Sequence, residues 1–247
     1  MTALLLALLG GAAVGLTLGA LGAGGSIVAV PALIYLLGFS PVDATTASLL
    51  IVVVTSLTAL VAHTRAGTVR WREGLLFAGA GVLPAAAAGL LSSRIPGTVL
   101  TLAFTVIAAA AGLRMLRPRA PSREGTVSGV RAAGAGAGLG AVTGFLGVGG
   151  GFLAVPALVS VLAVPIRAAA GTSLLVVIAN AVAALAARAG TGLDLDWSLV
   201  LPFTAAAVLG AWDGRRLAAK VRAATLQRLF GALLLAVALV MAVGTAL

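Results

Sequence analysis

The 247-residue chain has no cysteine and few charged residues. Without cysteine it forms no disulfide, binds no metal through thiolates and has no cysteine nucleophile. Charged residues make up 9% of the chain, whereas soluble domains have about 25%. Hydrophobic residues make up 61%, which leaves too little polar surface to cover a water-soluble globule. The composition therefore predicts a membrane protein.

Chemically reactive groupings are also scarce. The sequence has one histidine and six acidic residues, and it shows neither a nucleophile paired with a base nor a cluster of metal ligands, as an enzyme would need. We therefore expect no enzyme activity, no cofactor and no metal site. The net charge of +10 comes from arginines and lysines at or between the ends of apolar segments, without the interleaved aromatics of a nucleic-acid face. Nucleic acid is thus not an expected partner.

What is present is a series of apolar segments. Runs such as 2–21, 44–62 and 231–247 contain no charge, and about 20 such residues cross a ~30 Å hydrocarbon core as a helix. We expect an all-α membrane protein with ten segments, at about 2–21, 25–38, 44–63, 74–92, 97–116, 131–146, 150–163, 169–188, 197–214 and 225–246.

The chain repeats itself. LGAGGSIVAVPAL at 21–33 recurs as LGVGGGFLAVPAL at 146–158, with nine of thirteen positions identical at an offset of 125. ATTASLL at 44–50 matches AAGTSLL at 169–175, and after one inserted residue the offset becomes 126. A repeat of this length is typical of transporters. We predict one membrane domain, 1–247, with repeat one at 1–116, a cytoplasmic linker at 117–130 and repeat two at 131–247.

Loop charge predicts that the two repeats are inverted. The loop between the third and fourth segments is basic in the first half (Arg65, Arg70, Arg72), but its equivalent contains Arg188 with Asp194 and Asp196. The next loop reverses this, with only Arg94 in the first half but Arg215, Arg216, Lys220 and Arg222 in the second. Basic loops face the cytoplasm. We therefore expect a multi-pass protein of the bacterial inner (plasma) membrane with the linker in the cytoplasm and both termini extracytoplasmic.

Glycines interrupt each repeat before a short segment. A stripe of glycines at 11, 15 and 19 recurs at 136, 140 and 144 and predicts close helix packing. The G-x-G-G elements precede segments 25–38 and 150–163, which are short for a crossing and either cross or re-enter. They mark either a packing kink or a broken helix whose free N–H groups bind an anion. The candidate binding glycines are Gly22, Gly24, Gly25, Gly147, Gly149, Gly150 and Gly151, and the helix-breaking prolines are Pro31 and Pro156.

Polar residues inside the segments are further candidates. Thr46 and Ser48 begin one segment, and Thr172 and Ser173 begin its equivalent. Such hydroxyls either cap the helix or line a pocket beside the glycine breaks. Thr55 and Asn180 occupy equivalent mid-segment positions. A polar group at that depth needs a partner, which is either a neighbouring helix or a bound substrate.

The paired GxGG…VPAL elements and the A-T/G-x-S-L-L segments resemble the sulfite exporter TauE/SafE family, also called the 4-toluene sulfonate uptake permease family. The resemblance covers nearly the whole chain. It implies a plasma-membrane permease for small sulfur-containing or organic anions such as sulfite, sulfoacetate, thiosulfate or sulfonates.

Taken together, these features predict an anion transporter that works by alternating access at a midplane site between inverted repeats. The alternatives are an anion channel and a non-transporting scaffold whose glycines only pack helices. The expected partners are a small anionic substrate and the lipid bilayer. A coupling ion (proton or sodium) and a homo-oligomer are compatible with the sequence but not specified by it.

Overall fold

The computed structural model describes residues 2–22, 27–92, 97–117, 129–146, 151–187 and 195–246. These residues form ten helices and no strand, which confirms the all-α prediction. The first five helices are α1 (Thr2–Leu21), α2 (Ala29–Leu37), α3 (Pro41–Arg65), α4 (Trp71–Ser92) and α5 (Gly97–Leu116). The second five are α6 (Gly129–Leu146), α7 (Gly151–Ser160), α8 (Ile166–Ala187), α9 (Trp197–Lys220) and α10 (Ala223–Ala246).

Several helices can cross a membrane. In the described part of the chain, four are long and apolar enough by length and composition, namely those at Thr2–Leu21, Asp43–Arg65, Ile166–Ala186 and Ala223–Val243. Large apolar side chains also lie on the outside of the molecule, such as Leu9, which is 68% exposed, and Leu83, which is 79% exposed. Contact with lipid stabilises such an apolar surface, whereas contact with water is unfavourable. The chain is an all-helical, multi-pass membrane protein.

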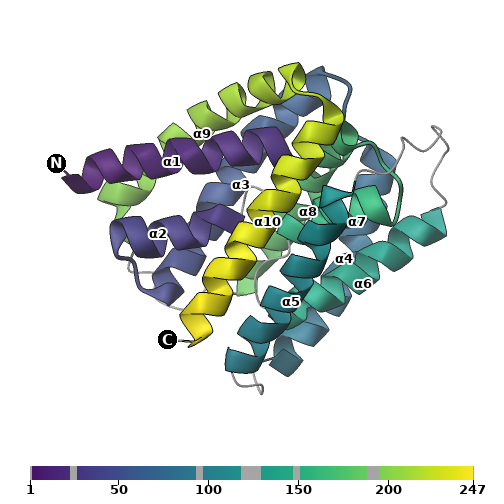
Figure 1. Cartoon of the computed structure of the whole chain (residues 1–247), viewed down its shortest axis with the longest axis horizontal. Coiled ribbons are helices and arrows are strands. Elements are labelled where there is room, and N and C mark those ends of the chain that lie inside the picture. The colour runs from purple at the N-terminus through teal and green to yellow at the C-terminus, as the bar shows by residue number, and fades with distance from the viewer. Residues whose placement is uncertain are drawn as a thin grey trace.

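The two short helices do not cross alone. α2 has 9 residues and α7 has 10, so at 1.5 Å per residue each is only about 14–15 Å long. Each contacts the helix before it, α2 on α1 and α7 on α6. In Figure 1, α2 turns back beneath α1, so the two helices form a hairpin. Neither short helix is therefore long enough to cross the hydrocarbon core by itself.

The ends of the short helices repeat in detail. Gly38 follows α2 with a φ of +71°, and Ala163 occupies the equivalent position after α7 with a φ of 54°. The next amides close the turn in the same way, since Phe39 N–H donates to Leu33 O at 3.2 Å and Val164 N–H donates to Leu158 O at 2.9 Å. This left-handed turn ends both helices.

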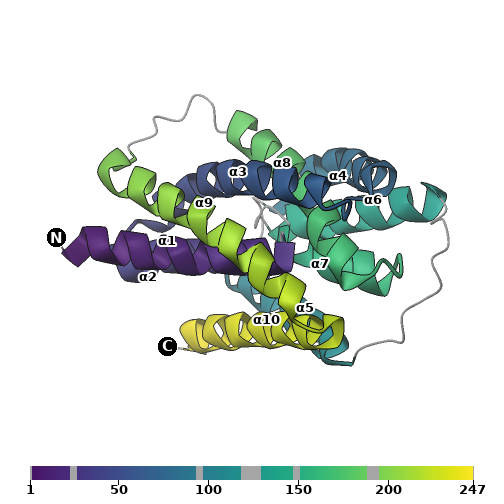
Figure 2. The ribbon, with the colours of Figure 1, turned by 90° about the horizontal axis from the view of Figure 1, so that it is seen from above.

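The two halves of the chain interlock through reciprocal helix pairs. α1 packs along α9, and its counterpart α6 packs along α4, the counterpart of α9. α3 packs on its own counterpart α8, and α5 on its counterpart α10. Figures 1 and 2 both show α1 beside α9, and α4 beside α6. Each of these four pairs consists of one helix from each half.

The glycine stripes make the two mixed pairs possible. A Cβ added to Gly11, Gly15 or Gly19 of α1 would overlap the carbonyls of Phe203, Ala207 and Ala211 of α9, respectively. In the same way, Gly136 and Gly140 of α6 lie against the carbonyls of Phe77 and Gly81 of α4. Small residues allow membrane helices to approach to backbone contact. The predicted packing role of the stripe is confirmed for these five glycines.

The equivalent helices α1 and α6 run in opposite directions. In both views α1 runs inward from the end of the molecule that holds the termini, and α6 runs inward from the other end (Figures 1 and 2). The N- and C-termini lie at the same end of the molecule. The buried core is shared, with Phe77 and Phe203, and Phe104 and Phe230, buried at equivalent positions.

Candidate functional site

The predicted anion site centres on the two G-x-G-G elements, of which the structure describes only the edges. Gly24, Gly25, Gly147, Gly149 and Gly150 lie outside the described residues. The described part of this region consists of the ends of the flanking helices and the polar side chains of α3 and α8.

Gly22 and Gly151 are the two candidate glycines that the structure describes. Gly22 follows the last residue of α1 with a φ of +68°, a conformation that ends helices and favours glycine. It is buried, and an added Cβ would overlap the carbonyl of Ala170 in α8. Gly151 is the first residue of α7 and is also buried. Gly22 thus both stops α1 and lets its end pack on α8.

The equivalent serines of α3 and α8 each make the same kind of hydrogen bond within their own helix. Ser48 Oγ donates to Thr45 O at 2.8 Å, and Ser173 Oγ donates to Ala170 O at 2.9 Å. Both side chains are buried. A hydroxyl has a single proton to donate, so in this arrangement each serine offers only acceptor capacity, and its side chain must rotate before it can donate to an anion.

Thr46 and Thr172 are buried as well, at 3% and 0% exposure. Thr172 Oγ1 accepts a hydrogen bond from the backbone N–H of Arg70 at 3.0 Å, which fastens the beginning of α4 to α8. Accepting this bond leaves the hydroxyl proton of Thr172 for another acceptor. Thr172 therefore joins α4 to α8, a structural role that the sequence did not suggest. Its hydroxyl proton is also compatible with the predicted role of donating a hydrogen bond to an anion.

The mid-helix pair differs between the halves. The buried Thr55 donates through Oγ1 to Ile51 O in its own helix at 2.6 Å. Asn180 is partly buried, and its amide makes no hydrogen bond to the residues that the structure describes. A carboxamide carries two N–H donors. Of the two equivalent side chains, Asn180 is thus the one whose N–H donors bond to no described residue.

The two prolines lie inside their helices. α2 runs from Ala29 through Pro31 to Leu37, with the proline in its first turn, where a missing N–H costs little. α7 runs through Pro156, which has no N–H to donate to the preceding turn. Each short helix therefore continues past its proline, and the break itself precedes the helix.

Two further polar groups of α3 are buried, and sequence reasoning did not single out the first of them, Ser56. Among the described residues, neither the hydroxyl of Ser56 nor the Nε2 atom of His63 has a hydrogen-bond partner. His63 Nδ1 lies 2.9 Å from Thr68 Oγ1, and the ring lies against Gly171 of α8. The repeat offered no signal for Ser56, because its equivalent in the second half is Ala181.

Metal binding finds no support in the described ranges, in which no group of three or more histidine or acidic side chains could hold an ion.

Comparison with known proteins agrees with this architecture. The profile of the family described as "Sulfite exporter TauE/SafE" matches residues 7–241. Two proteins from Xylella fastidiosa, strains Temecula1 and 9a5c, each named "Probable membrane transporter protein", are 36% identical over 238 residues, which is 93% of this chain and 91% of theirs. The chain belongs to the sulfite exporter TauE/SafE family.

Proposed function

We propose that the protein is a membrane transporter for small anions, and that its substrates are sulfur-containing anions such as sulfite, sulfoacetate or sulfonates. Membership of the TauE/SafE family supports this, as does the name of the Xylella relatives. The alternative of a passive scaffold would explain the packed glycine stripe but not the second glycine element, which precedes a helix too short to cross.

The observation that carries the proposal is the reciprocal packing of the two halves. α1 packs on α9 as α6 packs on α4, while α3 and α5 pack on their own counterparts. Together with the opposite directions of α1 and α6 in Figures 1 and 2, this pattern is what a twofold axis between two inverted repeats would produce. Inverted repeats place a substrate site near the midplane, where their broken helices face each other.

The anion is held by backbone N–H groups at the two breaks, around Gly24 and Gly25 and around Gly149 and Gly150. The N-terminal ends of α2 and α7 carry a partial positive charge that favours an anion. Thr172 and Asn180 supply further N–H and O–H donors. A site of neutral donors keeps no fixed buried charge when the substrate leaves, which suits repeated binding and release.

Alternating access then moves sub-bundles rather than whole repeats. The glycine contacts join α1 to α9 and α6 to α4 at backbone distance, and each of these pairs contains one helix from each half. Sliding one repeat as a body against the other would break both contacts at once. The rocking units are therefore the mixed pairs, moving against α3, α8, α5 and α10.

Flux measurements test the function and the site together. Purified protein in proteoliposomes is expected to show saturable counterflow of radiolabelled sulfite or a small sulfonate. Gly25→Trp and Gly150→Trp should each reduce this flux about tenfold or more, because the new side chain fills the anion position. Gly138→Trp is the matched control, since Gly138 is exposed on α6 and an added Cβ meets no atom within 4 Å.

The outcomes separate the alternatives. Normal flux in both the Gly25 and Gly150 variants would remove the site assignment, and flux without counterflow would indicate a channel instead of a carrier. No flux of any sulfur-containing anion in the wild type would leave the scaffold as the better explanation.

A further inference from the structure

A cavity lies at the end of the molecule where the linker begins, away from the glycine breaks. It has a volume of about 570 Å³ and is lined by residues of α5, α7 and α10, together with Arg117, which directly follows α5. Sites for small molecules commonly have volumes of ~300–1,000 Å³. The lining residues are Leu113, Arg114, Leu116, Arg117, Val159, Ser160 and Gln227.

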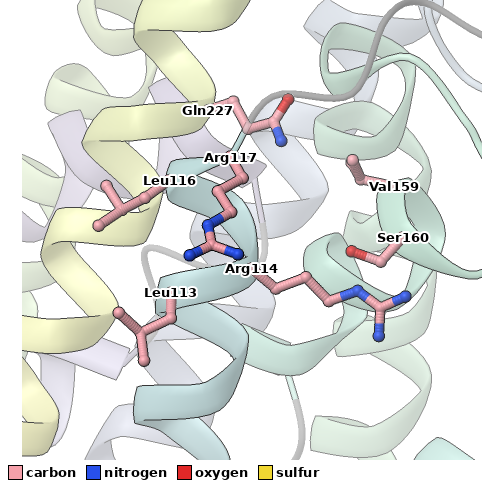
Figure 3. A pocket seen from close by; sticks show the side chains of 7 residues that line it. All are labelled: Leu113, Arg114, Leu116, Arg117, Val159, Ser160 and Gln227. Carbon is pink, nitrogen blue, oxygen red and sulfur yellow. The ribbon is translucent and has the colours of Figure 1, made fainter.

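The two arginines of this cavity lack acidic partners. The structure describes four acidic residues, and each is engaged elsewhere: Glu73 with Arg70 at 3.9 Å, Asp213 with Arg216 at 3.6 Å, Asp43 with Ser40, and Asp196 with Ser198. Figure 3 shows Arg114 reaching from α5 across the opening towards Ser160 of α7, with Arg117 above it. Two guanidinium groups thus face one space without a carboxylate from any described residue.

Gln227 is the second, independent indication of a ligand. Its side chain is only 9% exposed, yet its amide makes no hydrogen bond to any described residue. In Figure 3 the amide points away from α10 into the space between α10 and α7. Because the amide bonds to no described residue, a ligand in the cavity would give it a hydrogen-bond partner.

The polar side chains of the cavity do not recur at the equivalent positions of the other half. At the positions equivalent to Arg114 and Arg117, the C-terminal part of α10 has Val240 and Val243, and Tyr35 is the equivalent of Ser160. If these arginines only compensated the dipole of a helix C-terminus, α10 would have the same need. The repeat therefore does not account for them.

We propose that this cavity binds the tetrahedral oxyanion group, sulfonate or phosphate, of an amphipathic anion. Arg114 and Arg117 bind the oxyanion through charge-assisted hydrogen bonds, whose fork geometry matches its oxygens. Gln227 donates a third hydrogen bond, and Leu113, Leu116 and Val159 contact the hydrocarbon part. Both an organic sulfonate and an anionic lipid headgroup have this chemistry, and basic pockets between membrane helices are known to take the latter. The proposal holds whether or not the protein transports anions.

Binding to the full-length protein tests the proposal in two arms. In the first, butanesulfonate and inorganic phosphate are titrated calorimetrically into protein in a neutral detergent. In the second, the protein is placed in nanodiscs that contain phosphatidylglycerol and phosphatidylcholine, and the retained lipids are identified by native mass spectrometry. The double variant Arg114→Gln/Arg117→Gln is expected to lower the affinity of the binding anion about tenfold or more. Gln227→Leu should lower it several-fold and leave the protein folded.

The control is Arg222→Gln/Arg228→Gln, which removes the same charge from the exposed beginning of α10 without touching the cavity. Loss of butanesulfonate binding in the cavity variants alone identifies a soluble anion as the ligand, and loss of phosphatidylglycerol alone identifies a lipid. Equal affinity in wild type and both double variants, or no binding of either class to the wild type, would overturn the proposal. A melting temperature equal to that of the wild type shows that the variants are folded.

Discussion

Ala163 has the same left-handed backbone conformation as the glycine at the equivalent position of the first half. Among the described residues it is the non-glycine residue with a positive φ, 54°, and its equivalent Gly38 has a φ of +71°. The turn after α7 is closed by the same hydrogen bond as the turn after α2. The left-handed conformation costs an alanine about 1–2 kcal/mol relative to glycine, so the second half retains the turn at a loss of stability.

Exchanging these residues tests that cost. Ala163→Gly should raise the free energy of unfolding by up to about 1 kcal/mol, since relief of strain is partly offset by a more flexible unfolded chain. Gly38→Ala should lower it by a similar amount, because an added Cβ there meets no atom within 4 Å and only the backbone conformation is strained. Reversible unfolding of the purified protein in mixed micelles measures both. A less stable Ala163→Gly variant would contradict this explanation.

At the same scale, Ser48 and Ser173 show a limit of reasoning from the sequence. Their equivalence was evident from the repeat, and both are buried. The helices begin seven residues before them, at Pro41 and Ile166, so neither serine caps its helix as the sequence allowed. Their hydroxyl protons, however, bond to carbonyls three residues earlier in the same helix. The rotamer of a serine determines whether its hydroxyl bonds to a carbonyl, to a backbone N–H at a helix end or to a ligand. Residue type alone does not predict which of these partners it has.

At the scale of elements, the tightest contacts are those of α1 with α9 and α6 with α4. Gly15 lies against the Ala207 carbonyl and Gly140 against the Gly81 carbonyl. A methyl group at either position must push two helix backbones apart. Gly138, on the same helix as Gly140, meets no atom within 4 Å and faces outward.

We therefore expect Gly15→Ala and Gly140→Ala to destabilise the protein similarly, by about 1–3 kcal/mol each, as overpacking does. Gly138→Ala should be neutral or stabilising by up to about 1 kcal/mol, because alanine is the better helix former. Thermal unfolding in detergent compares the three. If Gly15→Ala and Gly140→Ala had the same melting temperature as Gly138→Ala, the glycine stripes would not hold the mixed pairs together.

The elements themselves could be predicted more fully than their partners. Apolar runs without charge marked the ten segments, and the paired G-x-G-G elements marked the short ones, because both signals are local in the sequence. The pairing of α1 with α9 depends instead on which small residues meet across almost 200 positions, such as Gly15 with Ala207. The cavity between Arg114 and Gln227 was missed for the same reason, since its arginines look like ordinary loop charges until α7 and α10 are placed beside them.

At the scale of the whole molecule, the termini share one end and the linker begins at the other (Figure 1). Charge predicts on which side of the bilayer each end lies. The linker and its neighbours include Arg114, Arg117, Arg119, Arg123 and Arg131, and basic loops stay in the cytoplasm. Inverted repeats add a second requirement, that equivalent loops of the two halves lie on opposite sides of the membrane.

The absence of cysteine from the chain makes both requirements directly testable with single cysteines and a membrane-impermeant maleimide. Ser122→Cys in the linker and Ala66→Cys in the α3–α4 loop should react only after the cells are permeabilised, because loop charge predicts that both lie on the cytoplasmic side. Thr2→Cys near the N-terminus and Thr191→Cys, in the equivalent loop of the second half, should react in intact cells. Labelling of Ala66→Cys and Thr191→Cys from the same side would mean parallel repeats. The two glycine elements would then no longer face each other across a twofold axis in the membrane plane, and the midplane anion site would lose its geometric basis.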